Sequence, residues 1–151
     1  MATRNLGETG NYLPLRLASN ALPRIELLPG MSWFVGSDRR VGAHHLWMTR
    51  IVVQRTLGVS PVHHHAESEA CVYGLRGRSA FFFGSELRER IDIGEGDFVF
   101  IPAWAIHAEM VLSADPFDCV MARSTPDPRS VNLPALHVPE EVLDEARLSA
   151  A

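Results

Sequence analysis

Short runs of alternating apolar and polar residues fill the middle of the chain, and glycines, prolines and other turn residues separate them. In LRERIDI (residues 87–93) leucine, glutamate and two isoleucines alternate with two arginines and an aspartate, which is typical of a strand with one solvated face. Comparable runs occupy residues 24–28, 31–35, 44–54, 71–77, 78–83, 96–102, 107–112 and 117–124. Strands this short and this evenly spaced predict an all-β fold, an antiparallel sandwich or barrel.

The two ends of the chain depart from this pattern. Residues 1–23 are polar and then apolar (YLPLRL), and we interpret them as an N-terminal arm outside a barrel formed by residues 24–126. Residues 127–151 begin as a loop, and Pro139 followed by two glutamates predicts the start of a short C-terminal helix. The leucines of the arm have no obvious place in a small barrel, and a bare edge strand invites pairing, so we expect a homodimer.

Composition narrows the class of protein. The 151 residues are 46% hydrophobic, which indicates one globular domain, and the net charge of -4 does not favour nucleic-acid binding. The most apolar stretch, FVFIPAWAI, is interrupted by Pro102 and is too short to span a membrane. The first twelve residues lack the apolar centre of a secretory signal, and we interpret Cys71 and Cys119 as buried free thiols, so we expect a cytoplasmic location.

The most unusual segment is PVHHHAESEACVYGLRGR (residues 61–78), which contains three of the chain's seven histidines in a row. If it is a strand, His63 and His65 lie on one face and His64 on the other. Glu67 and Glu69 share the parity of His63 and His65. Two imidazoles and a carboxylate on one face suit a divalent metal ion, whose fourth ligand would come from elsewhere in the barrel. His107 is the candidate, because it follows a turn after a strand that ends at Pro102.

These two segments resemble the two signature motifs of the cupin superfamily. The first motif corresponds to Gly58, His63, His65, Glu69 and Gly77, and the second to Gly96, Pro102, Trp104 in place of a glycine, and His107. The resemblance covers roughly residues 51–123 and implies a small single-domain metal-binding protein. Its expected fold is one antiparallel cupin-type barrel, also called a double-stranded β-helix or jelly roll. The family spacing selects Glu69 over Glu67 as the acidic ligand.

The expected site holds one divalent transition-metal ion, and iron, manganese, cobalt, nickel, copper and zinc all suit three imidazoles and a carboxylate. If strand alternation continues, Tyr73 follows the face of Glu69, and Glu109 follows that of His107. Both are candidates for proton transfer near the metal. The surrounding aromatic residues favour an aromatic or otherwise hydrophobic small molecule as substrate or ligand.

Three functional classes remain open at this point. The resemblance implies a metal-dependent enzyme of the dioxygenase, decarboxylase or isomerase type. A cupin that binds or senses a ligand without turnover is the first alternative. A zinc cupin in natural-product biosynthesis, for example in nitrogen–nitrogen bond formation, is the second. Metal identity, substrate and turnover do not follow from the residues.

Overall fold

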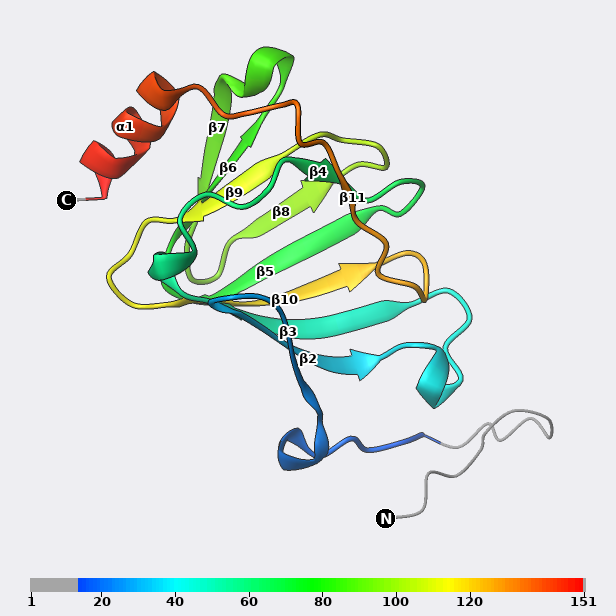
Figure 1. The fold of residues 1–151 in the computed structure, drawn as a ribbon. Coiled ribbons are helices and arrows are strands. Elements are labelled where there is room, and N and C mark those ends of the chain that lie inside the picture. Colours follow the sequence, from blue (N-terminus) through cyan, green and yellow to red (C-terminus); the bar gives the residue numbers. More distant parts are fainter. Residues whose placement is uncertain (1–13, 151) are drawn as a thin grey trace.

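Two antiparallel sheets pack against each other in the computed structural model, which describes residues 14–150 (Figure 1). The larger sheet has the strand order β1-β2-β3-β10-β5-β8, and the smaller has the order β7-β6-β9. A further pair, β11-β4, is formed by short strands. All of these pairings are antiparallel, so the predicted antiparallel barrel is confirmed.

The elements follow one another closely, and most of the turns between them are short. The strands are β1 (Arg24–Leu28), β2 (Met31–Ser37), β3 (Trp47–Val53), β4 (His63–His64), β5 (Ala70–Arg76), β6 (Ser79–Phe83), β7 (Glu89–Ile93), β8 (Phe98–Ile101), β9 (Ala108–Val111), β10 (Phe117–Arg123) and β11 (Val131–Asn132). The helices are the 3-10 turns η1 (Ser19–Ala21), η2 (Arg39–Val41), η3 (Arg55–Leu57) and η4 (Ser85–Leu87), and the α-helix α1 (Glu140–Ser149).

Strand alternation explains why the core lies between the sheets. Every second residue of β3 is buried, from Trp47 to Val53, and the same holds for β10, from Phe117 to Arg123. The apolar side chains among them pack with Phe81 of the smaller sheet in one hydrophobic cluster. The alternate residues point to the outer face of the larger sheet. The barrel interior is therefore mostly apolar, and polar side chains enter it at the site described below.

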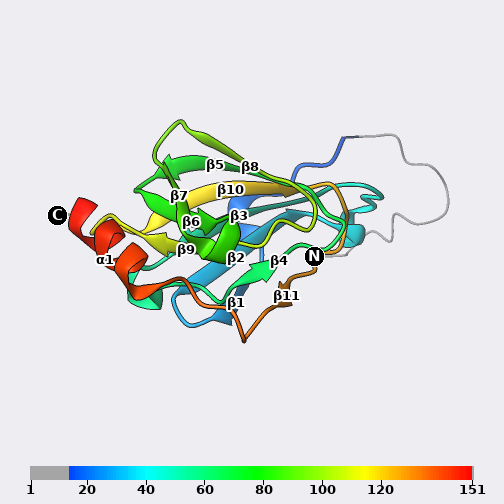
Figure 2. The same cartoon turned by 90° about the horizontal axis from the view of Figure 1, so that it is seen from above.

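The predicted C-terminal helix is confirmed, and it covers the outer face of the smaller sheet (Figures 1 and 2). Val142, Leu143 and Ala146 of α1 are buried against Phe82 of β6 and Met110 of β9 in a second hydrophobic cluster. Because the inner face of β6 and β9 packs against the main core and the outer face against α1, this sheet is apolar on both sides.

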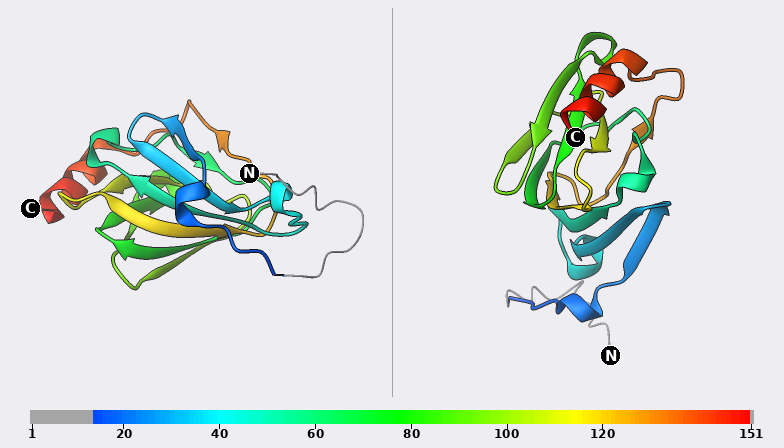
Figure 3. Two further views of the ribbon diagram at one scale, coloured as in Figure 1. Left: turned by 90° about the horizontal axis from the view of Figure 1, so that it is seen from below. Right: turned by 90° about the vertical axis from the view of Figure 1, so that its left-hand side faces the viewer.

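The described part of the N-terminal arm lies beside β1, away from α1 (Figure 3). Leu15 is 56% exposed and Leu17 is 40% exposed, so these leucines do not pack into the barrel. Tyr12 and Leu13, on which the predicted arm also rests, lie outside the described residues. Within residues 14–150, no helix has the length and apolarity needed to cross a membrane.

Candidate metal centre

Backbone pairing brings the two histidine segments together. The N–H of His63 donates to the carbonyl of His107 (3.0 Å), and the N–H of His107 donates to the carbonyl of His63 (2.9 Å). On its other side β4 pairs with β11, where His63 lies opposite Asn132. Both histidines are therefore held by main-chain hydrogen bonds, and their side chains enter the barrel from adjacent, paired segments.

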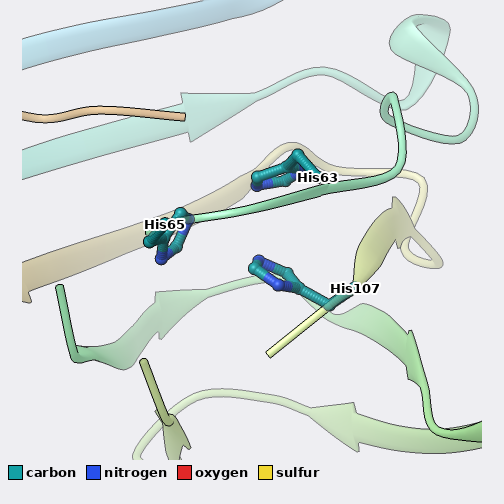
Figure 4. A group of neighbouring side chains, drawn as sticks. All are labelled: His63, His65 and His107. Atoms are coloured by element: carbon teal, nitrogen blue, oxygen red, sulfur yellow. The ribbon is translucent and has the colours of Figure 1, made fainter. Parts of the chain in front are cut away.

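The three imidazoles of His63, His65 and His107 converge on one point (Figure 4). Their ring centroids are 5.2 Å apart for His63–His65, 4.3 Å for His63–His107 and 4.8 Å for His65–His107. One ring nitrogen from each lies within 4.8 Å of the others. His65 is 1% exposed and His107 is 4% exposed, while His63 is half-buried.

The hydrogen bonds of these rings fit metal ligation. Nδ1 of His63 donates to the carbonyl of Pro61 (2.9 Å), and Nδ1 of His107 donates to the carbonyl of Ala105 (2.9 Å). Because a carbonyl can only accept, each ring carries its proton on Nδ1 and keeps a free lone pair on Nε2. Neither ring nitrogen of His65 has a hydrogen-bond partner among the described residues. Buried polar atoms without partners are costly, and a divalent ion would satisfy these nitrogens.

The electrostatic surroundings keep the buried imidazoles neutral, which is the form that binds metal. Burial lowers the pKa of His65 to about 2, and the positive charge of Arg123 contributes in the same direction. Burial also lowers the pKa of His107, although the carboxylate of Glu109 opposes this shift. Cys119 lines the same cavity, but burial raises its pKa to about 12, so it is present as a thiol and not as a thiolate ligand.

The three histidines form part of the wall of a cavity of about 240 Å³ inside the barrel. Most of the wall is apolar, and it includes Trp33, Phe81, Phe117 and Met121. Glu109 also lines the cavity, and its Oε2 is buried with no hydrogen-bond partner among residues 14–150. The predicted orientation of Glu109, on the same face as His107, therefore agrees with the structure.

The structure does not bring Glu69 and Tyr73 to this cavity. Ala70 and Val72 of β5 are buried in the core, so strand alternation turns Glu69 and Tyr73 to the outer face of the sheet. Glu69 is exposed, its backbone N–H donates to Ser124 Oγ (3.0 Å), and the ring of Tyr73 packs on that of Phe98 (4.6 Å). Glu67, the alternative carboxylate, is exposed as well and is not part of the histidine group.

A turn between β4 and β5 explains this difference from the predicted geometry. In a single strand over residues 63–73, as the sequence predicts, alternation would continue unbroken. Ala66 instead adopts a φ of 52°, and the N–H of Ser68 donates to the carbonyl of His65 (3.1 Å). The turn reverses the alternation, so that the inward positions are His65 before it and Ala70 after it.

Trp104 stabilises this arrangement although the family motif has glycine at its position. Its φ of 65° lies in the left-handed region, which glycine adopts most easily. The N–H of Trp104 donates to the carbonyl of Ala66 (2.8 Å), and its ring lies 5.4 Å from that of His64. The turn before His107 is thereby joined to the turn after His65. His64 itself lies outside the histidine group, as predicted.

Arg123 is the cavity residue that the sequence analysis missed. It occupies the last inward position of β10 and is 3% exposed, and its guanidinium lies 5.2 Å from the ring of Trp47. Burial lowers its pKa to about 10, which leaves it protonated at neutral pH. The signal in the sequence is the alternation of FDCVMAR, which places Arg123 on the same face as Phe117.

Comparison with solved structures supports the fold. An oxalate decarboxylase from Lactobacillus farciminis, in complex with formate, is 21% identical, with a TM-score of 0.65 over 76% of this chain and 34% of its own. A variant of the Bacillus subtilis oxalate decarboxylase is 15% identical, with a TM-score of 0.64 over 76% of this chain and 31% of its own. The chain thus spans about a third of the length of these structures. At these identities the likeness shows the fold alone.

No curated protein matches the chain in sequence. The family model of the cupin domain, however, matches residues 51–122, which include all three histidines of the cavity wall and the strands that hold them. The match agrees with the two motif segments and with the antiparallel barrel that the structure shows. The chain belongs to the cupin superfamily.

Proposed function

We propose that this cupin is a metal-dependent enzyme that acts on a small organic molecule, with chemistry of the dioxygenase, decarboxylase or isomerase type. The observation that carries the proposal is the convergence of three histidine side chains on the wall of a cavity of about 240 Å³. The ring nitrogens that face one another are free to bind an ion, and the cavity leaves space beside them for a second molecule.

His63, His65 and His107 would hold the ion, a divalent transition metal such as iron, manganese, cobalt, nickel, copper or zinc. When bound, such an ion would supply Lewis-acid or redox chemistry beside the cavity. Three protein ligands leave several coordination positions for water or substrate. The sequence spacing proposes Glu69 as a fourth ligand, whereas its exposed position favours a centre that uses the three histidines alone.

Glu109 is proposed as the group that accepts or donates a proton during the reaction. Its backbone is held by Ser60, whose Oγ accepts from the Glu109 N–H (3.0 Å) and whose N–H donates to the Glu109 carbonyl (2.8 Å). Its buried Oε2 has no hydrogen-bond partner among the described residues and lines the cavity. A carboxylate in this position can exchange a proton with a substrate atom without losing an existing contact. The ring of Tyr73 packs on Phe98, and Tyr73 is not among the residues that line the cavity, which favours Glu109 over Tyr73 for this role.

The surrounding wall supports a hydrophobic substrate. Trp33, Phe81 and Phe117 enclose one part of the cavity and would exclude water from a bound molecule. The expected aromatic or apolar substrate is consistent with this wall. Phe81 and Met121 line the cavity, whereas Trp104 is exposed.

Metal content per chain, combined with an oxygen-consumption screen, tests the proposal. The untagged chain should contain close to one ion per chain, and a His63→Ala, His107→Ala double variant should contain none. His64→Ala is the matched control, because it removes the neighbouring imidazole outside the group. Iron with oxygen uptake favours a dioxygenase, and zinc without uptake favours the natural-product alternative. A wild-type chain that binds none of the six metals would refute the metal centre.

We also propose that the chain forms a homodimer. The support is the outer face of the larger sheet, where Phe98 and Phe100 of β8 are 70% and 60% exposed. Within the described residues β8 pairs only with β5, so its other edge is open. Two large apolar side chains on an open edge strand favour contact with a second copy.

A further inference from the structure

The guanidinium of Arg123 is buried without a matching anion. Nε donates to Met121 Sδ (3.4 Å), Nη1 to the Arg129 carbonyl (2.9 Å) and Nη2 to Ser130 Oγ (3.4 Å). A guanidinium has five N–H donors, so two have no acceptor among residues 14–150. Arg123 forms no ion pair within 4.0 Å with any carboxylate of the described chain.

A buried charge of this kind is costly unless an opposite charge is brought to it. The carboxylate of Glu109 acts on Arg123 across the cavity but does not contact it. A divalent ion bound to the three histidines would add further positive charge to the same cavity. With such an ion bound, the positive charge of the ion and Arg123 would exceed the single negative charge of Glu109, and an anionic ligand would compensate the difference.

The wall of the cavity indicates where the rest of such a ligand would lie. All four inward residues of β10 line it, in the order Phe117, Cys119, Met121 and Arg123. At about 3.3 Å per residue, the wall changes from an aromatic ring to a guanidinium over about 20 Å. Met31 and Val53 belong to the wall at the Phe117 end, while Ser130 and His65 belong to it with Arg123. One end of the cavity is thus apolar and the other cationic.

We propose that the cavity binds an organic acid, with its carboxylate on the free N–H groups of Arg123 and its apolar body toward Phe117. This assignment of a substrate class rests on the proposed function of the same site. The cavity of about 240 Å³ is larger than the roughly 150 Å³ that accommodates benzene, so an aromatic ring and a carboxylate fit together. The carboxylate end of the acid would then lie beside the three histidines.

A purely structural role for Arg123 makes a different prediction. Its bonds to Arg129 and Ser130 attach the loop after β10 to the barrel, and that role alone would give no preference for acids. A ligand pair that differs only in charge separates the two roles without any mutation. Benzoate, phenylacetate, 3-phenylpropanoate and hexanoate, each paired with its primary amide, form such a set.

Calorimetric titration of the purified full chain with this set tests the proposal, with metal content measured in the same samples. At least one acid should bind more tightly than its amide by about tenfold or more. Arg123→Met should lower the affinity for that acid about 10- to 100-fold and leave the affinity for its amide nearly unchanged. Arg50→Met is the matched control, because Arg50 lies on the same sheet but faces outward and pairs with Asp118. It should bind like the wild type.

The titrations are repeated after removal of metal with a chelator. A preference for acid over amide that persists without metal and disappears in Arg123→Met supports the proposal, even if the metal centre itself is refuted. A preference that disappears with the metal and survives in Arg123→Met assigns the carboxylate to the ion and overturns the proposal. Equal affinity of every acid and its amide also overturns it. If Arg123→Met does not fold, Arg123→Lys, which keeps the charge but loses the two-pronged geometry, must still weaken the acid selectively.

Discussion

His65 makes the stability of the metal-free protein sensitive to pH. It is 1% exposed, has no hydrogen-bond partner among the described residues, and its pKa in the folded protein is about 2. In the unfolded chain an ordinary histidine has a pKa of about 6.5. Below pH 6.5 the unfolded chain therefore binds a proton that the folded protein does not bind at His65. The extra proton stabilises the unfolded state relative to the folded state, so the free energy of unfolding decreases as the pH falls.

The size of the loss follows from the two pKa values. Each pH unit between them contributes about 1.36 kcal/mol, so lowering the pH from 7.5, where both states are unprotonated at this residue, to 4.5 costs roughly 2.7 kcal/mol. Because the folded pKa lies well below 4.5, the result depends almost entirely on the unfolded value. A loss of this size is a large part of the roughly 5–15 kcal/mol that stabilises an ordinary domain.

Urea unfolding of the chelator-treated protein at pH 7.5 and pH 4.5 measures this effect. Other groups also titrate in this range, and the pKa of His107 is lowered too, so the wild type alone does not isolate His65. His65→Leu replaces the imidazole by an apolar side chain of similar size. Between pH 7.5 and pH 4.5 the free energy of unfolding of this variant should fall by roughly 2.7 kcal/mol less than that of the wild type. His64→Leu leaves His65 in place and should lose as much as the wild type. Equal losses in His65→Leu and the wild type would refute the reasoning.

Three further predictions concern the metal, the proton and the oligomeric state. His63→Ala should lose most of the bound metal because it removes a ligand, whereas Glu69→Ala should keep close to one ion per chain; an equal loss would make Glu69 a ligand. Glu109→Gln should keep the metal but lower turnover about 100-fold or more, measured on the first active substrate, and unchanged turnover would exclude Glu109 from proton transfer. Phe98→Asp should convert a dimer to a monomer in light scattering, and a monomeric wild type would refute the homodimer.

Local sequence patterns were sufficient to predict those strands and helices whose conformation depends on residues close together in the chain. Alternation in segments such as 87–93 and 117–123 indicated strands, and Pro139 with the two glutamates indicated the start of α1. The histidines His63, His65 and His107 were identified because their spacing matches family motifs, and the structure brings their rings together.

The positions of Glu69 and Tyr73 relative to the cavity could not be predicted in this way. Alternation relates the residues of one strand to each other, but a turn with a positive φ at Ala66 interrupts it between His65 and Glu69. Nothing in HHHAESE distinguishes that turn from a continuous strand, because alanine adopts a positive φ only where the surrounding contacts require it. Here the hydrogen bond from Trp104 to the Ala66 carbonyl is such a contact, and it joins segments far apart in the chain.

The amino-acid sequence by itself determined the class of fold, the family and the three histidines that converge on the cavity, since these depend on periodicity and on residue spacing. Only the tertiary structure decided that Arg123 lines the cavity and that Glu69 and Tyr73 do not, whereas the sequence already predicted the orientation of Glu109. The physical reason is that a strand has two equivalent faces until another sheet covers one of them. In this protein β6, β7 and β9 cover the face that bears Arg123, and so a buried cation lies beside the three histidines.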